Sequence, residues 1–176
     1  ADEEGLRPAD YHQAALRAAV AEIDGGRLDR ADAAGWAAAD ILLSDAFLLY
    51  GSHLLAGRVN PATFDSEWHA NRPDGDLAAV LQQAVDADDV AGALRGLLPA
   101  GTAYAELKDA LRGYRTAAQA GGWLAIPAGP TLRSGDTGDR VTALTRRLAA
   151  TADLAVDDAP PDRFDERVHD AVGRFQ

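Results

Sequence analysis

The chain has 176 residues, of which 47% are hydrophobic and 26% charged, a composition typical of a folded protein with one ordinary core or two small ones. Its 28 acidic and 17 basic residues give a net charge of −11, which repels phosphate backbones and anionic lipids, so we expect no nucleic-acid binding. The absence of cysteine excludes disulfides, thiolate metal sites and a cysteine nucleophile within these residues.

Helical periodicity dominates the first 122 residues. The first helix is expected to end at Gly25 and Gly26, and the second to begin at a cap on Asp29 or Asp32 and to end at Gly57. No convincing strand pattern accompanies these helices, so we predict an all-α fold.

The second predicted helix contains the longest apolar stretch, residues 37–55. Asp40, Asp45 and His53 interrupt it, and a charge near mid-span opposes membrane insertion by roughly 2.5–3.5 kcal/mol. We therefore expect no membrane insertion but a central helix of a soluble domain, packed on several sides. Its apolar positions include Trp36, Ile41, Leu43, Phe47 and Leu54.

Three more helices are expected before residue 122. Asp76 caps the first of them, Pro99 ends the second, and Thr102 opens the third. The third carries apolar side chains at the spacing of a buried stripe, namely Tyr104, Leu107, Leu111 and Tyr114.

A polar connection over residues 60–75 joins the second and third helices and is a candidate for function. Phe64 and Trp68 are possible anchors for it. Trp68 and Arg72, with His69 and Asn71 between them, could bind a sugar ring and its polar groups. The simpler interpretation, that Trp68 is a loop anchor buried on the domain, is favoured.

A Gly- and Pro-rich stretch over residues 121–130 marks a change in composition. We divide the chain there into a helical domain of residues 1–122, a linker of residues 123–126 and a second domain of residues 127–176. The second domain has two expected helices, separated by a loop at Pro160 and Pro161. Its expected core positions are Leu132, Val141, Leu144, Leu148, Phe164, Val168 and Val172.

The second domain resembles the small three-helix peptidoglycan-binding domain found in many cell-wall enzymes. The match comprises the run Leu-Arg-Ser-Gly-Asp-Thr-Gly-Asp-Arg-Val at 132–141, then Leu144 and Leu148, and a later half with Phe164-Asp165, Val168, Ala171-Val172 and Phe175-Gln176. Members of that family continue into a third helix, and we expect this domain to be truncated. Val172 and Phe175 would then be exposed and would favour self-association.

The upstream part is similar to the scaffold domain of large L,D-transpeptidases. The similarity lies in the run Ile-Leu-Leu-Ser-Asp-Ala-Phe-Leu-Leu-Tyr at 41–50, in Leu-Ala-Gly-Arg-Val-Asn-Pro at 55–61, in residues 97–104, and in Gly122-Trp123. In that family a later domain carries a histidine and a cysteine nucleophile, and neither that domain nor its Ser/Thr-His-Gly-Cys motif is in this sequence.

The two resemblances imply a non-catalytic part of an L,D-transpeptidase-like protein that binds peptidoglycan and positions substrate, without a cofactor. They also imply the cell envelope, periplasmic or secreted, although residues 1–5 have no signal-peptide character. The charged residues near the predicted start of the helix after Gly138 are candidates for holding stem-peptide carboxylates: Arg133, Asp136, Asp139 and Arg140. Capping and solvated ion pairs are the simpler interpretation of these four residues.

Two other function classes remain open from the sequence. A carboxylate- or metal-dependent wall hydrolase would use the acidic clusters at 86–89 and 157–166, which we interpret as helix caps and solvated charge instead. The four histidines are scattered, and none is spaced for a zinc site on one helix. The other class is a helical module that binds proteins.

Overall fold

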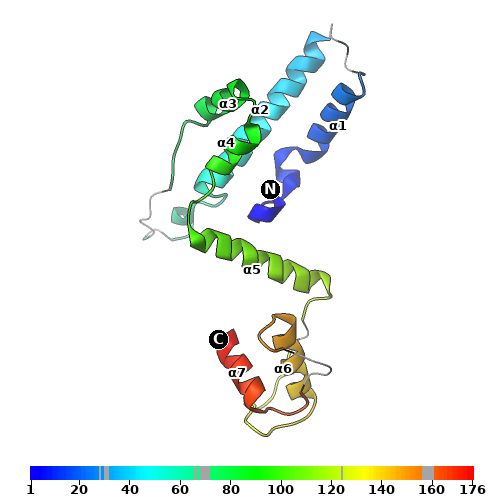
Figure 1. Ribbon diagram of the computed structural model, residues 1–176, viewed down its shortest axis with the longest axis vertical. Coiled ribbons are helices and arrows are strands. Elements are labelled where there is room, and N and C mark those ends of the chain that lie inside the picture. Colours follow the sequence, from blue (N-terminus) through cyan, green and yellow to red (C-terminus); the bar gives the residue numbers. More distant parts are fainter. Residues whose placement is uncertain (28, 30–31, 66, 68–71, 124, 156–160) are drawn as a thin grey trace. The chain divides into compact units, whose positions relative to one another are not determined.

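The computed structural model describes residues 1–27, 29, 32–65, 67, 72–123, 125–155 and 161–176. Within these ranges the protein has seven α-helices, three short 3-10 helices and no strand, so the predicted all-α fold is confirmed (Figure 1). The α-helices are α1 (Gln13–Asp24), α2 (Ala33–Ala56), α3 (Leu77–Asp86), α4 (Val90–Gly96), α5 (Thr102–Gln119), α6 (Asp139–Ala150) and α7 (Glu166–Phe175).

The chain divides into two compact units, Ala1–Ala105 and Glu106–Gln176. This division falls inside α5, whereas the change in composition lies at 121–130. The domain boundary near residue 122 stays a prediction from composition, and the packing divides the chain at residue 105.

Aspartate side chains begin four of the helices. In each case the carboxylate accepts a hydrogen bond from the backbone N–H three residues later, which satisfies one of the unpaired donors of the first turn. The caps are Asp32 of α2, Asp76 of α3, Asp89 of α4 and Asp165 of α7, with N···O distances of 2.7–3.0 Å. Asp32, and not Asp29, is thus the cap of the long helix.

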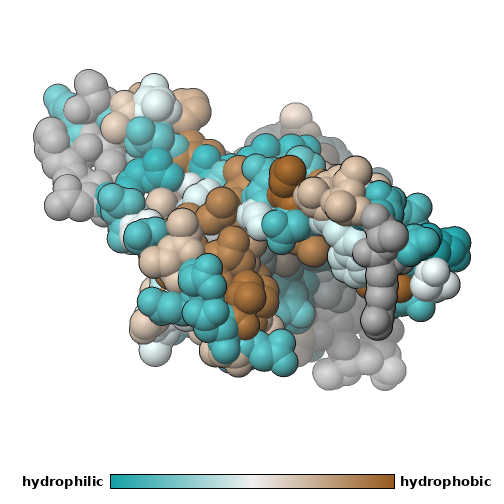
Figure 2. All heavy atoms as spheres, turned by 90° about the horizontal axis from the view of Figure 1, so that it is seen from above, coloured by the Kyte–Doolittle hydropathy of each residue, from teal (hydrophilic) through white to brown (hydrophobic). Residues whose placement is uncertain are grey.

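Helix α2 is packed more completely along its second half than along its first, where Ala39 is the buried residue. Ala46, Phe47 and Leu54 are buried in the second half, and α1, α3 and the short helix Pro8–Tyr11 contact α2. In the first half Ile41 is 69% exposed, and Trp36 and Leu43 are also exposed. The expectation of packing on several sides is therefore wrong for these three residues, whose apolar side chains stay exposed. Figure 2 shows that hydrophobic residues reach the surface between hydrophilic ones on the face that it draws.

Among the described helices, α2 alone is long and apolar enough to cross a membrane by length and composition. Core helices of soluble proteins meet the same criterion, so this property assigns no location.

Helix α5 has no buried residue, although its sequence has the spacing of a buried stripe. Tyr104 is half-buried, and its hydroxyl donates a hydrogen bond to the Glu4 carboxylate within the first unit. Leu107, by contrast, is 69% exposed, and Tyr114 is exposed as well. The predicted buried stripe is therefore wrong for these two residues: the periodicity of a helix shows that a face is apolar but not that another element covers it.

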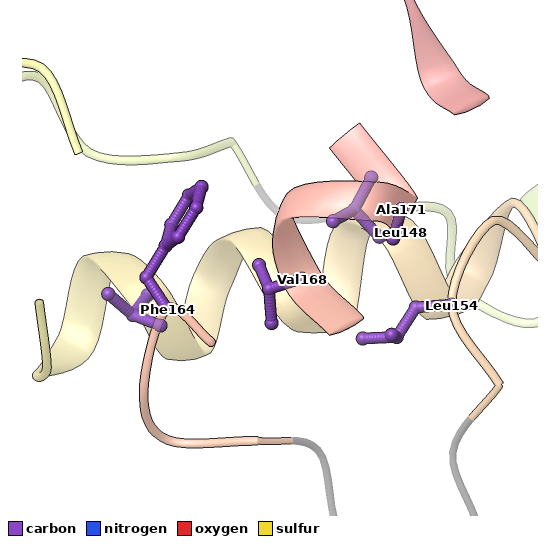
Figure 3. Close-up of a cluster of buried hydrophobic side chains, with 6 residues drawn as sticks. Leu148, Leu154, Phe164, Val168 and Ala171 are labelled. Carbon is purple, nitrogen blue, oxygen red and sulfur yellow. The ribbon is translucent and has the colours of Figure 1, made fainter. Parts of the chain in front are cut away.

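The core of the second unit lies between α6 and α7 (Figure 3). Val141, Val168 and Ala171 have no exposed surface, and Phe164 and Leu154 lie at opposite ends of the cluster. Each large apolar side chain buried here contributes roughly 1.5–3 kcal/mol to folding. The predicted core residues Val141, Leu148, Phe164 and Val168 are confirmed as buried, and Leu132, Leu144 and Val172 pack at the edge of this cluster.

Two backbone hydrogen bonds hold the turn before α6 against the segment before α7. The N–H of Gly135 donates to the carbonyl of Phe164, and the N–H of Phe164 donates to the carbonyl of Asp136, both at 2.8 Å. Gly135 has φ +94°, a left-handed backbone conformation that residues other than glycine rarely adopt. The turn is thus a fixed part of the second unit.

Candidate functional site

The predicted charged group of the second unit divides into two structural and two exposed residues. Asp136 is half-buried, and its carboxylate accepts a hydrogen bond from the backbone N–H of Arg133 at 2.8 Å. It therefore closes the turn that precedes α6. The simpler interpretation, capping, therefore holds for Asp136.

The Arg140 guanidinium is hydrogen-bonded to backbone carbonyls of the same unit. Its Nε donates to the carbonyl of Pro127 at 2.9 Å, and its Nη1 donates to the carbonyl of Pro130 at 2.5 Å. Gly129 lies directly against the guanidinium, because a Cβ at that position would be 2.8 Å from the central carbon of the group. The geometry makes Arg140 a clasp for the 127–130 segment and leaves it poorly placed to bind a stem-peptide carboxylate.

The side chains of Arg133 and Asp139 are exposed. Asp139 occupies the first turn of α6, where a carboxylate is stabilised by the positive end of the helix dipole. Of the four predicted residues, these two have the exposure that ligand binding requires.

In the first unit, Arg72 binds the end of α2 instead of lying open to a ligand. Its Nε donates to the carbonyl of Ala56 at 2.9 Å and its Nη2 to the carbonyl of Gly57 at 2.7 Å, so the guanidinium satisfies terminal carbonyls of the helix. Trp68, His69 and Asn71 lie outside the described residues. Phe64 is 83% exposed, so the expectation that it anchors this connection is wrong.

An aromatic and cationic group that no sequence pattern predicts lies in the second unit. The guanidinium carbon of Arg147 is 3.8 Å from the centre of the Trp123 ring and 5.4 Å from that of Phe175. The rings of Trp123 and Tyr114 meet edge to face, with centres 5.7 Å apart and an interplanar angle of 69°. The Nη1 atom of Arg147 is shielded from solvent and has no hydrogen-bond partner, so the cation is held mainly by ring contacts.

A hollow of about 840 Å³ adjoins this group within the second unit. Helix α5 forms one side, and the C-terminal ends of α6 and α7 form the other; Tyr114 and Phe175 line both the hollow and the aromatic group. Its wall combines small apolar side chains with charged ones, among which are Asp109, Arg112, Asp153 and Arg174. A site with these components can hold a ligand that has both apolar faces and polar edges.

The first unit has a smaller, almost wholly apolar groove of about 340 Å³ between α1, α2 and α4. Beside it, the Tyr11 hydroxyl and His53 Nδ1 are hydrogen-bonded at 2.9 Å. Burial raises the pKa of Tyr11 and of Tyr50, and burial followed by the Glu4 carboxylate raises the pKa of Tyr104. These hydroxyls therefore stay protonated at neutral pH and are poor nucleophiles or bases.

Acidic clusters do not assemble a metal site within the described ranges, where no group of three or more His, Asp or Glu side chains could hold a metal ion. Asp89 and Asp165 are helix caps, as described above, and Asp88 lies between α3 and α4 with a left-handed backbone. Asp157 and Asp158 lie outside the described residues. The carboxylates with a visible role are thus structural.

Comparison with known proteins gives one result. A family model described as Scaffold domain matches residues 1–111, which is more than half of the chain and includes all of the first unit. No curated protein and no solved structure matches. The chain therefore belongs to the Scaffold domain family.

Proposed function

We propose that this protein is a non-catalytic cell-wall module, in which the first unit is a scaffold and the second binds peptidoglycan. The main support comes from the second unit. The sequence positions that carry its resemblance to peptidoglycan-binding domains include the buried residues Val141, Leu148, Phe164 and Val168. Sequence likeness and packing thus fall on the same residues, as expected if the likeness reflects a common fold.

In this proposal the module acts by holding a parent enzyme near its substrate. Tethering raises the local concentration of the polymer without lowering a chemical barrier. Acyl transfer of the L,D-transpeptidase type requires a thiolate, which these residues lack, so the chemistry would belong to another domain of the parent protein in the cell envelope.

Contacts with the polymer are expected to be local. The net charge of −11 provides no long-range attraction for the carboxylates of the stem peptide. Exposed Arg133 can bind such a carboxylate directly, and Asp139 nearby in the sequence can accept a hydrogen bond from a peptide amide.

Co-sedimentation with purified sacculi tests the proposal. The whole chain should pellet with sacculi, and Arg133→Ala combined with Asp139→Ala should weaken the binding. Arg146→Ala is the matched control, because Arg146 is also exposed and lies on α6. A whole chain that stays in the supernatant would show that it is not a wall-binding module. Incubation with disaccharide tetrapeptide should give no crosslinked dimer by mass spectrometry.

The exposed apolar side chains of Ile41 and Leu107 favour one alternative, a helical module that binds another protein. Capture of a specific protein, abolished by Ile41→Ser or Leu107→Ser in a chain that does not pellet with sacculi, would favour this alternative.

A further inference from the structure

We propose that the hollow between α5 and the C-terminal ends of α6 and α7 is a saccharide-binding site, whose aromatic platform consists of Tyr114 and Phe175, which line it, and of Trp123, which contacts Tyr114 beside it. The inference rests on the proposed function in one respect: it names the glycan strand, in addition to the stem peptide, as a part of the wall polymer that the second unit binds.

Backbone geometry places the Trp123 ring beside Tyr114. Helix α5 ends at Gln119, and Gly121 and Gly122 follow with φ of +104° and +71°. These left-handed conformations, which glycine adopts at little cost, reverse the chain so that Trp123 meets Tyr114 on the last turns of α5. Trp123 thus belongs to the folded second unit and is not a passive part of a linker.

Arg147 fixes the orientation of the rings. Its guanidinium lies against the face of Trp123 and within reach of the ring of Phe175, so one group from α6 contacts aromatic residues from two separate segments of the second unit. A ring held in this way loses little rotamer freedom when a ligand binds. Trp123 still has 39% of its surface exposed, and Tyr114 and Phe175 are also exposed, so ligand can reach all three side chains.

The mixture of groups around the hollow suits a sugar. A pyranose ring has apolar C–H faces that pack on aromatic rings, and hydroxyl groups around its edge that need hydrogen-bonding partners. Asp109 and Arg112 form an exposed ion pair at 2.7 Å on α5. Opposite them, the Arg174 guanidinium binds the carbonyl of Asp153, and the hydroxyl of Thr151 donates to the Asp153 carboxylate. Polar groups therefore line the hollow beside the rings.

The charges and size of the hollow argue for a neutral ligand of small-molecule size. Two aspartates and two arginines line it, so their formal charges cancel and no cluster of cations is present to select a phosphate or a nucleic acid. Its volume of about 840 Å³ is within the range of about 300–1,000 Å³ typical of ligand sites. A polar lining of this kind would be poorly matched to a wholly apolar helix of a partner protein.

Calorimetric titration of the whole chain with N-acetylglucosamine oligomers, compared with its Trp123→Ala variant, tests the site. The Trp123→Ala variant loses an aromatic face for the sugar ring and should bind the oligomers about tenfold more weakly. A tenfold change in affinity corresponds to about 1.4 kcal/mol. Trp36→Ala is the matched control, because Trp36 is 40% exposed but belongs to the first unit. Trp123→Phe keeps an aromatic face and should restore most of the affinity. Circular dichroism and hydrogen exchange of α6 and α7 check that each variant is folded.

The outcomes separate this inference from the proposed function. If the whole chain pellets with sacculi but Trp123→Ala and Trp36→Ala bind oligomers equally, the saccharide site is wrong and the wall-binding function stands. If oligomers bind through Trp123 and sacculi do not pellet the chain, the site is supported and wall binding is wrong. The inference would be overturned if the whole chain bound no oligomers. It would also be overturned if Trp123→Ala weakened the capture of a protein but left oligomer binding unchanged.

Discussion

The α6–α7 pair and the long helix α2 differ in how completely their apolar residues are buried. Val141, Leu148 and Val168 are within 1% of complete burial in a pair of helices of 12 and 10 residues. Helix α2 has 24 residues and a more apolar sequence, yet Ile41 and Leu43 are exposed. Burial thus depends on the partner that an apolar face meets more than on the length or hydrophobicity of the helix.

Several polar contacts in the first unit join segments distant in sequence. Asp10 is bound to Arg58 at 2.9 Å, His12 lies 2.7 Å from Asp45, and Tyr104 donates to Glu4. These contacts connect the N-terminal residues to α2 and to the start of α5. Exposed pairs of this kind contribute about 0–1 kcal/mol each, far less than a buried leucine. We therefore expect the two units to respond differently to the same substitution.

The largest expected effect is that of Leu148→Ala in the α6–α7 core. Removing a fully buried leucine leaves a cavity and should lower the free energy of unfolding of the second unit by about 3–5 kcal/mol. Leu107→Ala, the matched change at an exposed position, should alter it by less than about 0.5 kcal/mol. Hydrogen exchange of α6 amides during urea unfolding measures both. Equal effects would contradict the difference in burial.

Phe47→Ala should have the next largest effect, about 3 kcal/mol on the first unit. Phe47 is buried but lines the apolar groove, so water and neighbouring side chains can enter the space that its ring leaves. Ile41→Ala on the exposed half of α2 is the control and should be nearly neutral. A large loss on Ile41→Ala, read from hydrogen exchange of α2, would mean that its face is covered in solution.

The cap of α7 gives a smaller effect. Asp165→Ala removes the acceptor for the N–H of Val168 and should cost about 1 kcal/mol. Asp162→Ala is the informative control, because Asp162 belongs to the acidic cluster at 157–166, whose sequence is interpreted as helix caps and solvated charge. The structure gives the capping role to Asp165, so Asp162→Ala should change the unfolding free energy of the second unit by less than about 0.5 kcal/mol in urea titration. The reverse order of effects would move the start of α7.

The smallest effect is a pH dependence confined to the first unit. Burial raises the pKa of Tyr104, and the Glu4 carboxylate raises it further, above the ordinary value of 10.0. A tyrosine whose folded pKa is raised stabilises the native state below that ordinary value, and its contribution is lost as the pH rises above it. Tyr104→Phe should therefore make the fall in stability between about pH 9 and about pH 11 shallower, by less than about 1 kcal/mol.

Urea unfolding of the first unit at several pH values measures this slope. Glu4→Gln, which keeps an acceptor and removes the charge, should also make the slope shallower. An unchanged slope in both variants would show that the Tyr104–Glu4 contact does not form in solution.

Helix positions could be predicted from the sequence because their signals are local. Asp76 and Asp89 lie one residue before their helices, and Gly57, with φ of +76°, follows the last residue of α2. Burial could not be predicted in the same way. The stripe containing Leu107 has the correct period, but the period carries no information about a covering element distant in sequence.

The candidate site shows the same limit. Arg133 and Arg140 are equivalent in sequence as charges near a helix start. The Arg140 guanidinium, however, is hydrogen-bonded to the carbonyls of Pro127 and Pro130, which lie 13 and 10 residues before it in sequence. The Gly and Pro residues around Trp123 predict a linker, whereas its contact with Arg147 joins segments 24 residues apart in sequence. The signal that could have indicated it is the pair of glycines that precedes an otherwise unexplained tryptophan.

The clasp formed by Arg140 has a consequence for how this sequence can diverge. Pro127 and Pro130 have no N–H, and a planar guanidinium reaches both of their carbonyls, whereas the single ammonium of a lysine has no such fork. Glycine at position 129 is compatible with this contact because it has no Cβ. A Cβ at that position would lie 2.8 Å from the central carbon of the guanidinium. Positions 129 and 140 should therefore change together: a relative that has lost the arginine is released from the requirement for glycine, and one that keeps the arginine is not.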